Sequence, residues 1–171
     1  MKLKTIKLKP INCINIKIKM KEKLLYSWED FDNDVKIIKL QLLSNNWIPD
    51  YIVGVKRGGL IPAIKLSHSL NRPMIMMSCQ LRDSADKEVR LYEVEEIPKD
   101  KNILIVDDIC DSGITMSKII IQFLSNLFPP NNVKTCSLFY NISQNFYIDY
   151  YARHINRSID DRWIAFPWES T

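Results

Sequence analysis

The chain has 171 residues, of which 46% are hydrophobic and 10% aromatic. This apolar content suffices for one folded domain and excludes global disorder. No apolar run approaches the roughly 20 residues that cross a bilayer, so we expect no membrane partner and a cytoplasmic location. The two histidines and four widely spaced cysteines disfavour a zinc site, a redox dithiol and a Ser-His-Asp hydrolase.

The net charge of +4 is concentrated at the start of the chain. Residues 1–23 contain eight lysines and one glutamate, a balance of +7, whereas the remaining 148 residues contain 16 basic and 19 acidic side chains, a balance of −3. We therefore divide the chain into a lysine-rich N-terminal extension, residues 1–23, and a folded domain, residues 24–171. A basic extension can bind nucleic acid or an anionic surface, but we favour a solvated leader and expect no nucleic-acid partner.

Isoleucine alternates with polar residues over positions 14–20, which predicts a strand or an extended arm. The first predicted helix begins after Ser27, a favourable N-cap that is followed by Glu29 and Asp30 in the first turn. It continues to about residue 45. Its apolar positions recur at helical spacing: Phe31, Val35, Ile38 and Leu42.

Strands and helices alternate in the rest of the chain. Strands are predicted at residues 51–55, 73–79, 103–106 and 133–139, and helices at residues 60–70 and 116–127. The polar and charged residues 80–101 predict a mobile loop or a hairpin. This order is typical of an α/β fold in which helices flank a central parallel sheet.

The chain contains four glycines, Gly54, Gly58, Gly59 and Gly113, and each lies where a predicted strand passes into a helix. Glycine permits an unusual backbone angle or a close approach to a ligand. In a parallel α/β sheet these crossings lie at the carboxyl edge, where ligands bind, and the N–H groups of a following helix can hold a phosphate. The glycines therefore predict a phosphate site at this edge.

The second glycine turn, within residues 106–115, carries most of the chemical information. It lacks the patterns of a Walker loop and of a dinucleotide-binding turn. Instead, Asp107 and Asp108 end the strand and precede the glycine, as expected if the hydroxyls of a sugar and a magnesium ion lie beside the phosphate. The alternative is a structural helix cap at Asp111 or Ser112, with Asp107 and Asp108 as acids at the sheet edge.

The run Val106-Asp107-Asp108-Ile109-Cys110-Asp111-Ser112-Gly113-Ile114-Thr115 resembles the signature of the type I phosphoribosyltransferases, which bind 5-phosphoribosyl-1-pyrophosphate (PRPP). Three further segments resemble the xanthine–guanine and hypoxanthine branch of this family. They are the opening helix at residues 28–50, the pyrophosphate loop at residues 55–63 and the base-covering segment at residues 161–169. The resemblance covers roughly residues 25–169.

The resemblance implies the type I phosphoribosyltransferase fold, with a flexible flap at about residues 80–101 and a small C-terminal hood at about residues 141–171. Asp107 and Asp108 would face the ribose hydroxyls, directly or through Mg²⁺, with Glu169 as a weaker metal candidate. The 5′-phosphate would be held by amides and hydroxyls of Ser112, Gly113, Ile114 and Thr115.

The resemblance also assigns the pyrophosphate and the base. The pyrophosphate would be held by Lys56, Arg57, Gly58 and Gly59. Family members often carry a non-proline cis peptide in that loop, and we expect it at Lys56–Arg57. In the flap, Arg82 would add positive charge over the pyrophosphate.

On the base side, Asp111 would accept a proton or a hydrogen bond from the imidazole ring of a purine. Trp163 would stack on the base, and the backbone of Ile164 would read the ring edge. Relatives that act on 6-oxopurines usually place a lysine where this chain has Asn141. An asparagine amide donates hydrogen bonds without a charge, so the identity of the base is left open.

The activity implied is transfer of the 5-phosphoribosyl group from PRPP to hypoxanthine, guanine or xanthine in purine salvage, with release of pyrophosphate. Adenine or a pyrimidine is an alternative acceptor. A different class of function is a regulatory protein that uses this fold to sense nucleotides and binds RNA or DNA through residues 1–23. Relatives commonly pair through surfaces near the pyrophosphate loop, so we expect a homodimer or homotetramer.

Overall fold

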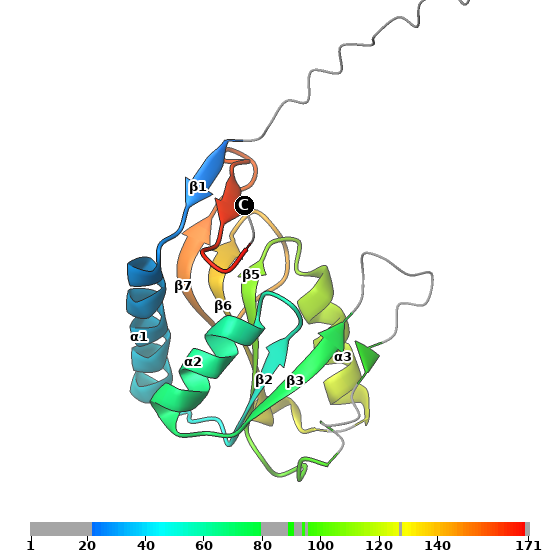
Figure 1. Cartoon of the computed structure of the whole chain (residues 1–171). Coiled ribbons are helices and arrows are strands. Elements are labelled where there is room, and N and C mark those ends of the chain that lie inside the picture. The colour runs from blue at the N-terminus through cyan, green and yellow to red at the C-terminus, as the bar shows by residue number, and fades with distance from the viewer. Residues whose placement is uncertain (1–21, 80–88, 91–93, 95, 127, 170–171) are drawn as a thin grey trace, which may run out of the picture.

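The computed structural model describes residues 22–79, 89–90, 94, 96–126 and 128–169 (Figure 1). Its helices are α1 (Trp28–Ser44), α2 (Leu60–Leu70) and α3 (Ile114–Asn126), with a 3-10 turn η1 at Pro130–Asn132. Its strands are β1 (Lys23–Leu25), β2 (Tyr51–Val55), β3 (Met74–Cys79), β4 (Val89–Arg90), β5 (Ile103–Cys110), β6 (Val133–Asn141), β7 (Tyr150–Ile155) and β8 (Trp163–Ala165).

Six strands form the central sheet in the order β4-β3-β2-β5-β6-β7. Five of them are parallel, and β4 joins the edge antiparallel to β3. The five parallel strands therefore end at the same edge of the sheet, the upper edge in Figure 1. The predicted α/β fold with a central parallel sheet flanked by helices is confirmed.

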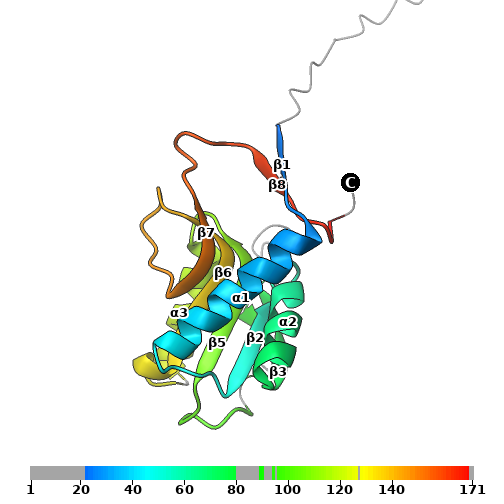
Figure 2. The same cartoon turned by 90° about the vertical axis from the view of Figure 1, so that its left-hand side faces the viewer.

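Helices α1 and α2 cover one face of the sheet, and α3 covers the other (Figure 2). Successive side chains of each inner strand point to opposite faces of the sheet. Ile52 and Leu104 pack with α1 and α2, whereas Val53 and Ile105 pack with α3. Full burial of one such side chain stabilises the folded state by about 1.5–3 kcal/mol relative to leaving it exposed. Strands that are buried on both faces have continuous apolar sequences. This explains why β2 and β5 could be predicted from the sequence.

Helix α1 begins where the sequence predicts. Ser27 Oγ accepts a hydrogen bond from the Asp30 N–H (3.0 Å), and the Asp30 carboxylate accepts one from the Ser27 N–H (3.0 Å). These two bonds form a capping box, which satisfies N–H groups that the helix leaves unpaired. The four apolar residues at helical spacing are all buried against the sheet: Phe31, Val35, Ile38 and Leu42.

Strand β7 was not predicted from the sequence. Arg153 and His154 interrupt the apolar pattern that marks a buried strand. In the structure, Arg153 Nε donates to the buried Asp34 carboxylate (2.7 Å), and Arg153 Nη2 donates to Asp30 (2.8 Å). Because α1 neutralises the charge of Arg153, a segment that is polar in sequence can pair at the edge of the sheet.

The end of the described chain returns to its beginning. Strand β8 pairs in parallel with β1, with Trp163 opposite Lys23 (Figure 2). The Trp163 N–H donates to the Glu22 carbonyl oxygen (2.9 Å). After β8, the rings of Phe166 and Trp168 stack with centroids 4.9 Å apart. Phe166 is buried in the core, and Trp168 is partly buried and packs against it. This small sheet lies above the carboxyl edge of the central sheet (Figure 1).

Two of the predicted segments lie outside the described residues. These are the arm at residues 14–20 and the part of the flap that holds Arg82. From the predicted loop or hairpin at residues 80–101, the described strand β4 pairs antiparallel with β3, with Arg90 opposite Ser78, which agrees with the hairpin alternative. Among the helices of the described ranges, none has the length and apolar content to span a membrane.

Candidate active site

Four loops meet at the carboxyl edge of the central sheet. They follow β2, β5, β6 and β7, which are neighbours in that order. The residues brought together are the loop at 56–59, the turn at 111–113, Asn141 at the end of β6 and Arg157 after β7. This edge is where parallel α/β sheets bind their ligands.

The β2–α2 loop packs directly against β5. The peptide bond between Lys56 and Arg57 is cis, as predicted, and both side chains are exposed. A β-carbon at Gly58 would overlap the Asp108 carboxylate, and one at Gly59 would overlap the carbonyl oxygen of Val106. Glycine at both positions therefore allows the loop to approach the aspartates closely.

The prediction for Gly54 is wrong. This glycine lies inside β2 rather than at the crossing into α2. A β-carbon there would lie 2.8 Å from the β-carbon of Ala63, on α2. Gly54 therefore serves the close packing of α2 on the sheet and not the approach of a ligand.

Asp107 and Asp108 lie within β5, because this strand continues four residues beyond the predicted end, to Cys110. The Asp107 carboxylate accepts a hydrogen bond from the Asp108 N–H (3.0 Å), and the Asp108 carboxylate accepts one from the Ile109 N–H (2.8 Å). Burial raises the pKa of Asp108 to about 6, and the charge of Glu169 acts in the same direction against the Ile109 hydrogen bond.

The turn after β5 offers hydrogen-bond donors. Gly113 has a φ of +72°, in the left-handed region that favours glycine, and a β-carbon there would overlap Phe146. Helix α3 begins at Ile114, whose N–H donates to Ser112 Oγ (3.4 Å). Because the first N–H groups of a helix have no partners within it, residues 112–115 present amides and hydroxyls of the kind that bind phosphate.

Asp111 is held from two sides. Asn141 Nδ2 donates to the Asp111 carbonyl oxygen (2.9 Å) and lies 3.4 Å from Asp111 Oδ1, to which Arg157 Nε also donates (3.1 Å). Of the two structural caps considered above, Ser112 contacts the start of α3, whereas the Asp111 carboxylate is directed to Arg157 and Asn141. Asp111 is also 49% exposed, so a ligand can reach it.

A cavity of about 490 Å³ opens beside Asp111, a volume that suits a small molecule. Trp163 lines this cavity and is 48% exposed, whereas its neighbour Ile164 is buried in the core. The complete set of lining residues is Asp111, Ser112, Asn141, Gln144, Arg157, Asp161, Arg162 and Trp163.

The sequence profile described as the phosphoribosyl transferase domain matches residues 24–171. The chain belongs to the phosphoribosyltransferase family. The resemblance inferred from the run at residues 106–115 is therefore confirmed, as is the type I fold.

Proteins similar to this phosphoribosyltransferase cover nearly all of it. The xanthine-guanine phosphoribosyltransferase of Cereibacter sphaeroides (strain ATCC 17025 / ATH 2.4.3) is 27% identical over 166 residues, which cover 88% of this chain and 92% of that protein. The purine phosphoribosyltransferase of Pyrococcus horikoshii Ot3 is 29% identical with a TM-score of 0.69, over 88% of this chain and 95% of that one. A Neisseria gonorrhoeae protein solved with bound ppGpp is 25% identical with a TM-score of 0.72, over 88% and 91% of the two chains.

The described part of this phosphoribosyltransferase contains no group of three or more His, Cys, Asp and Glu side chains arranged to hold a metal ion. Asp107 and Asp108 supply two hard oxygen ligands, and Mg²⁺ prefers such ligands together with water and substrate phosphates. The donor set therefore fits a magnesium ion that shares its ligands with a phosphorylated substrate. The charge of Glu169 helps to raise the pKa of Asp108. Glu169 Oε2 itself accepts a hydrogen bond from the Phe166 N–H (3.4 Å).

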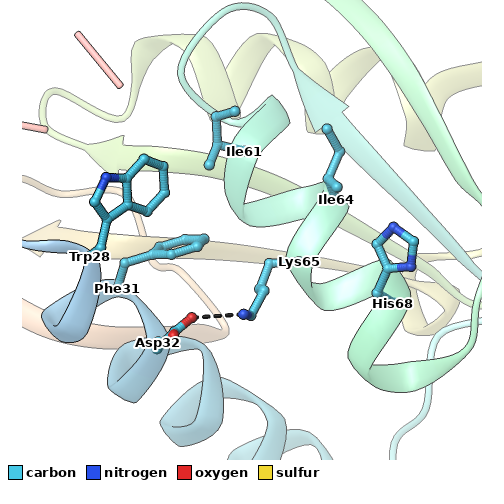
Figure 3. A pocket seen from close by; sticks show the side chains of 7 residues that line it. All are labelled: Trp28, Phe31, Asp32, Ile61, Ile64, Lys65 and His68. Carbon is cyan, nitrogen blue, oxygen red and sulfur yellow. Dashed lines mark ion pairs between the residues drawn. The ribbon is translucent and has the colours of Figure 1, made fainter. Parts of the chain in front are cut away.

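A second cavity, of about 350 Å³, lies between α1 and α2 (Figure 3). An ion pair between Asp32 and Lys65 (2.7 Å) joins the two helices there. None of the residues predicted to hold PRPP or the base lines this cavity. Its lining residues are Trp28, Phe31, Asp32, Ile61, Ile64, Lys65 and His68. It is therefore separate from the candidate active site of the phosphoribosyltransferase.

Three residues at the candidate site were not predicted from the sequence. Gln144 and Phe146, in the loop between β6 and β7, lie against Gly113, and Arg157 pairs with Asp111. The one available signal was that Arg157 follows the end of a strand, but that strand, β7, was itself not predicted.

Proposed function

We propose that this phosphoribosyltransferase transfers the 5-phosphoribosyl group from PRPP to a 6-oxopurine, that is, to hypoxanthine, guanine or xanthine, and releases pyrophosphate. The nucleoside 5′-monophosphate formed is the product of purine salvage. One observation carries the proposal: paired aspartates, a glycine turn opening α3 and a cavity beside Trp163 meet at one edge of the sheet. Further support comes from similar proteins named xanthine-guanine and purine phosphoribosyltransferases.

In the proposed complex, the turn at residues 112–115 holds the 5′-phosphate through its amides and hydroxyls. Asp107 and Asp108 face the ribose hydroxyls. A magnesium ion held by these carboxylates and the substrate would neutralise charge on the pyrophosphate. The exposed cations Lys56 and Arg57 lie in the loop that contacts Asp108, and we assign the pyrophosphate to this loop, with Gly58 and Gly59 allowing its close approach.

The reaction breaks the bond between the anomeric carbon and a pyrophosphate oxygen and forms a bond from that carbon to a purine nitrogen. The transition state has oxocarbenium character, so the leaving charge must be stabilised, which Lys56 and Arg57 do electrostatically. Trp163 stacks on the base and keeps the attacking nitrogen in line. Asp111 accepts the proton or hydrogen bond on the imidazole side of the base.

A panel of bases tests this proposal. The full chain is incubated with PRPP, Mg²⁺ and one of hypoxanthine, guanine, xanthine, adenine, uracil or orotate, and pyrophosphate and nucleotide are quantified. We expect release with at least one 6-oxopurine and none with the pyrimidines. Release with adenine alone or with a pyrimidine alone would assign a different acceptor. No release with any base would exclude the transferase activity.

The regulatory alternative has one supporting observation, the ppGpp bound to the similar Neisseria gonorrhoeae protein. A nucleotide sensor that binds RNA or DNA through residues 1–23 should lose affinity steeply as salt rises, and entirely when those residues are removed. The exposed cations of the pyrophosphate loop favour the transferase, because a sensor need not keep them.

Three finer predictions accompany the proposal. We expect a homodimer or homotetramer, which light scattering of the full chain would measure. We expect Arg82 to contribute to pyrophosphate binding from the flap, so that Arg82→Ala raises the KM for PRPP more than the KM for the base. We expect the enzyme in the cytoplasm, which fractionation of cells would test.

A further inference from the structure

Asp111, Asn141 and Arg157 form a polar cluster on the wall of the 490 Å³ cavity. Asp111 follows β5, Asn141 ends β6 and Arg157 follows β7. Because these strands are neighbours, the sheet sets the order of the three residues. The family signature accounts for Asp111, and Asn141 occupies the position where relatives place a lysine. Arg157 is the cation of this cluster, and the signature assigns it no role.

The Asn141 amide is fully engaged within the protein. Its Nδ2 is directed to the Asp111 carbonyl oxygen (2.9 Å) and carboxylate (3.4 Å). Its Oδ1 accepts from the Ser143 N–H (3.1 Å), the Ser143 hydroxyl (2.7 Å) and the Arg157 N–H (3.1 Å). The residue is 5% exposed. Because a buried amide loses free energy when its partners are removed, Asn141 is suited to fixing Asp111 and Arg157 rather than to meeting a base.

The Arg157 guanidinium is partly engaged. Nε donates to Asp111 Oδ1 (3.1 Å), and Nη1 donates to the Arg162 carbonyl oxygen (2.5 Å). Among the residues that the structure describes, Nη2 makes no hydrogen bond. With 21% of the side chain exposed on a wall of the cavity, Arg157 is both held in place and able to donate to a ligand.

We propose that Arg157 is a specificity-determining residue, which donates a hydrogen bond to the exocyclic 6-oxygen of the purine while Asp111 accepts one from the neighbouring ring nitrogen. The inference deepens the proposed function and rests on it. In this chain the donor to the 6-oxygen would therefore be Arg157, after β7, and not a lysine at the end of β6, where Asn141 stands. Both positions line the same cavity.

The chemistry favours an oxygen at this position of the base. A guanidinium is a permanent cation with donors in a rigid fork, and arginine is the usual partner of the guanine 6-oxygen in nucleic-acid recognition. Adenine carries an amino group there, so two donors would face each other. The other cation of the cavity, Arg162, is already paired with Asp160 through Nε (3.0 Å) and Nη2 (2.9 Å).

The test compares four proteins: wild type, Arg157→Gln, Arg157→Lys and the control Arg72→Gln. Arg72 lies before β3, at the opposite edge of the sheet, so its replacement removes an equal charge away from the site. For Arg157→Gln we expect kcat/KM for the preferred 6-oxopurine to fall about 10- to 100-fold, mainly through the KM for the base, with the KM for PRPP within about threefold. Arg157→Lys should restore most of the loss, and Arg72→Gln should match wild type.

A second readout separates recognition from positioning. Isothermal titration with GMP and AMP should give a GMP preference in wild type that falls at least about tenfold in Arg157→Gln. An equal loss for both nucleotides, or an unchanged preference with a lower kcat for every base, would overturn the inference and leave Arg157 as a support for Asp111. Thermal unfolding shows whether Arg157→Gln is folded. If it is not, the ratio of the affinities of Arg157→Lys for GMP and AMP decides the question. Inactivity of the wild type with all bases would instead reject the proposed function.

Discussion

The Asp108 carboxyl lies against Gly58 and near Glu169, and its burial raises its pKa to about 6, whereas an aspartate in an unfolded chain has a pKa of about 3.9. The folded state therefore binds this proton more tightly than the unfolded state does. The stabilisation by the proton is complete below about pH 4 and is lost as the pH rises through about 6. Above that pH the protein retains a charge whose burial costs free energy, at the position proposed to face the ribose.

We predict that Asp108→Asn raises the free energy of unfolding by about 1–2 kcal/mol at pH 8. The amide avoids the cost of burying a charge and can still accept the hydrogen bond from the Ile109 N–H. Urea unfolding of both proteins at pH 4, 6 and 8 measures the difference, which should shrink toward zero at pH 4. The variant should also lose at least about tenfold in kcat/KM for PRPP. A variant that is less stable than wild type at all three pH values would contradict this explanation.

The contact between Gly58 and Asp108 gives a second prediction. In Gly58→Ala the new β-carbon would meet a side chain that can rotate, so we expect Asp108 to turn away while the fold is retained. The kcat/KM for PRPP should fall by at least about tenfold, with the midpoint of thermal unfolding changed by only a few degrees.

Gly59→Ala is the matched control for Gly58→Ala. Its β-carbon would meet the backbone at Val106, which cannot turn aside, so we expect a loss of about 1–3 kcal/mol in stability. If Gly58→Ala kept the wild-type KM for PRPP, the contact with Asp108 would have no part in binding the ribose donor.

At the scale of elements, the sequence predicts those helices and strands that carry their own local signal. Helix α1 has a capping box and four apolar residues at helical spacing, and the apolar runs of β2 and β5 reflect burial on both faces of the sheet. Strand β7 lacks such a signal, because Arg153 is neutralised by Asp34, 119 positions away. No local pattern reports a partner at that distance.

The pairing of α1 with β7 gives a prediction at this scale. Arg153→Met would leave the buried Asp34 carboxylate with the Tyr26 hydroxyl (2.8 Å) but without its cation. We expect the free energy of unfolding to fall by about 2–4 kcal/mol in urea. Lys65→Met breaks an exposed ion pair with Asp32 and should cost less than about 1 kcal/mol. Equal losses in the two variants would show that burial of the Asp34 pair is unimportant.

For the whole molecule, strand order determines how many residues of the candidate site can be predicted from the sequence. The turn at residues 111–115 is contiguous, so its residues could be predicted together. Arg157 and Phe146 reach the site only because β6 and β7 lie beside β5, and long-range packing decides which strands are neighbours. The same limit applies at the start of the chain, where β1 (Lys23–Leu25) pairs with β8 and no local pattern reports that partner.

The central claim, that the end of β5 and its glycine turn bind the ribose donor, is tested most directly by a crystal structure of the chain soaked with PRPP and Mg²⁺. We predict the 5′-phosphate within about 2.7–3.2 Å of the backbone amides of residues 112–115, with the ribose hydroxyls facing Asp107 and Asp108. A turn left empty by PRPP, or PRPP bound instead in the cavity between α1 and α2, would contradict the claim.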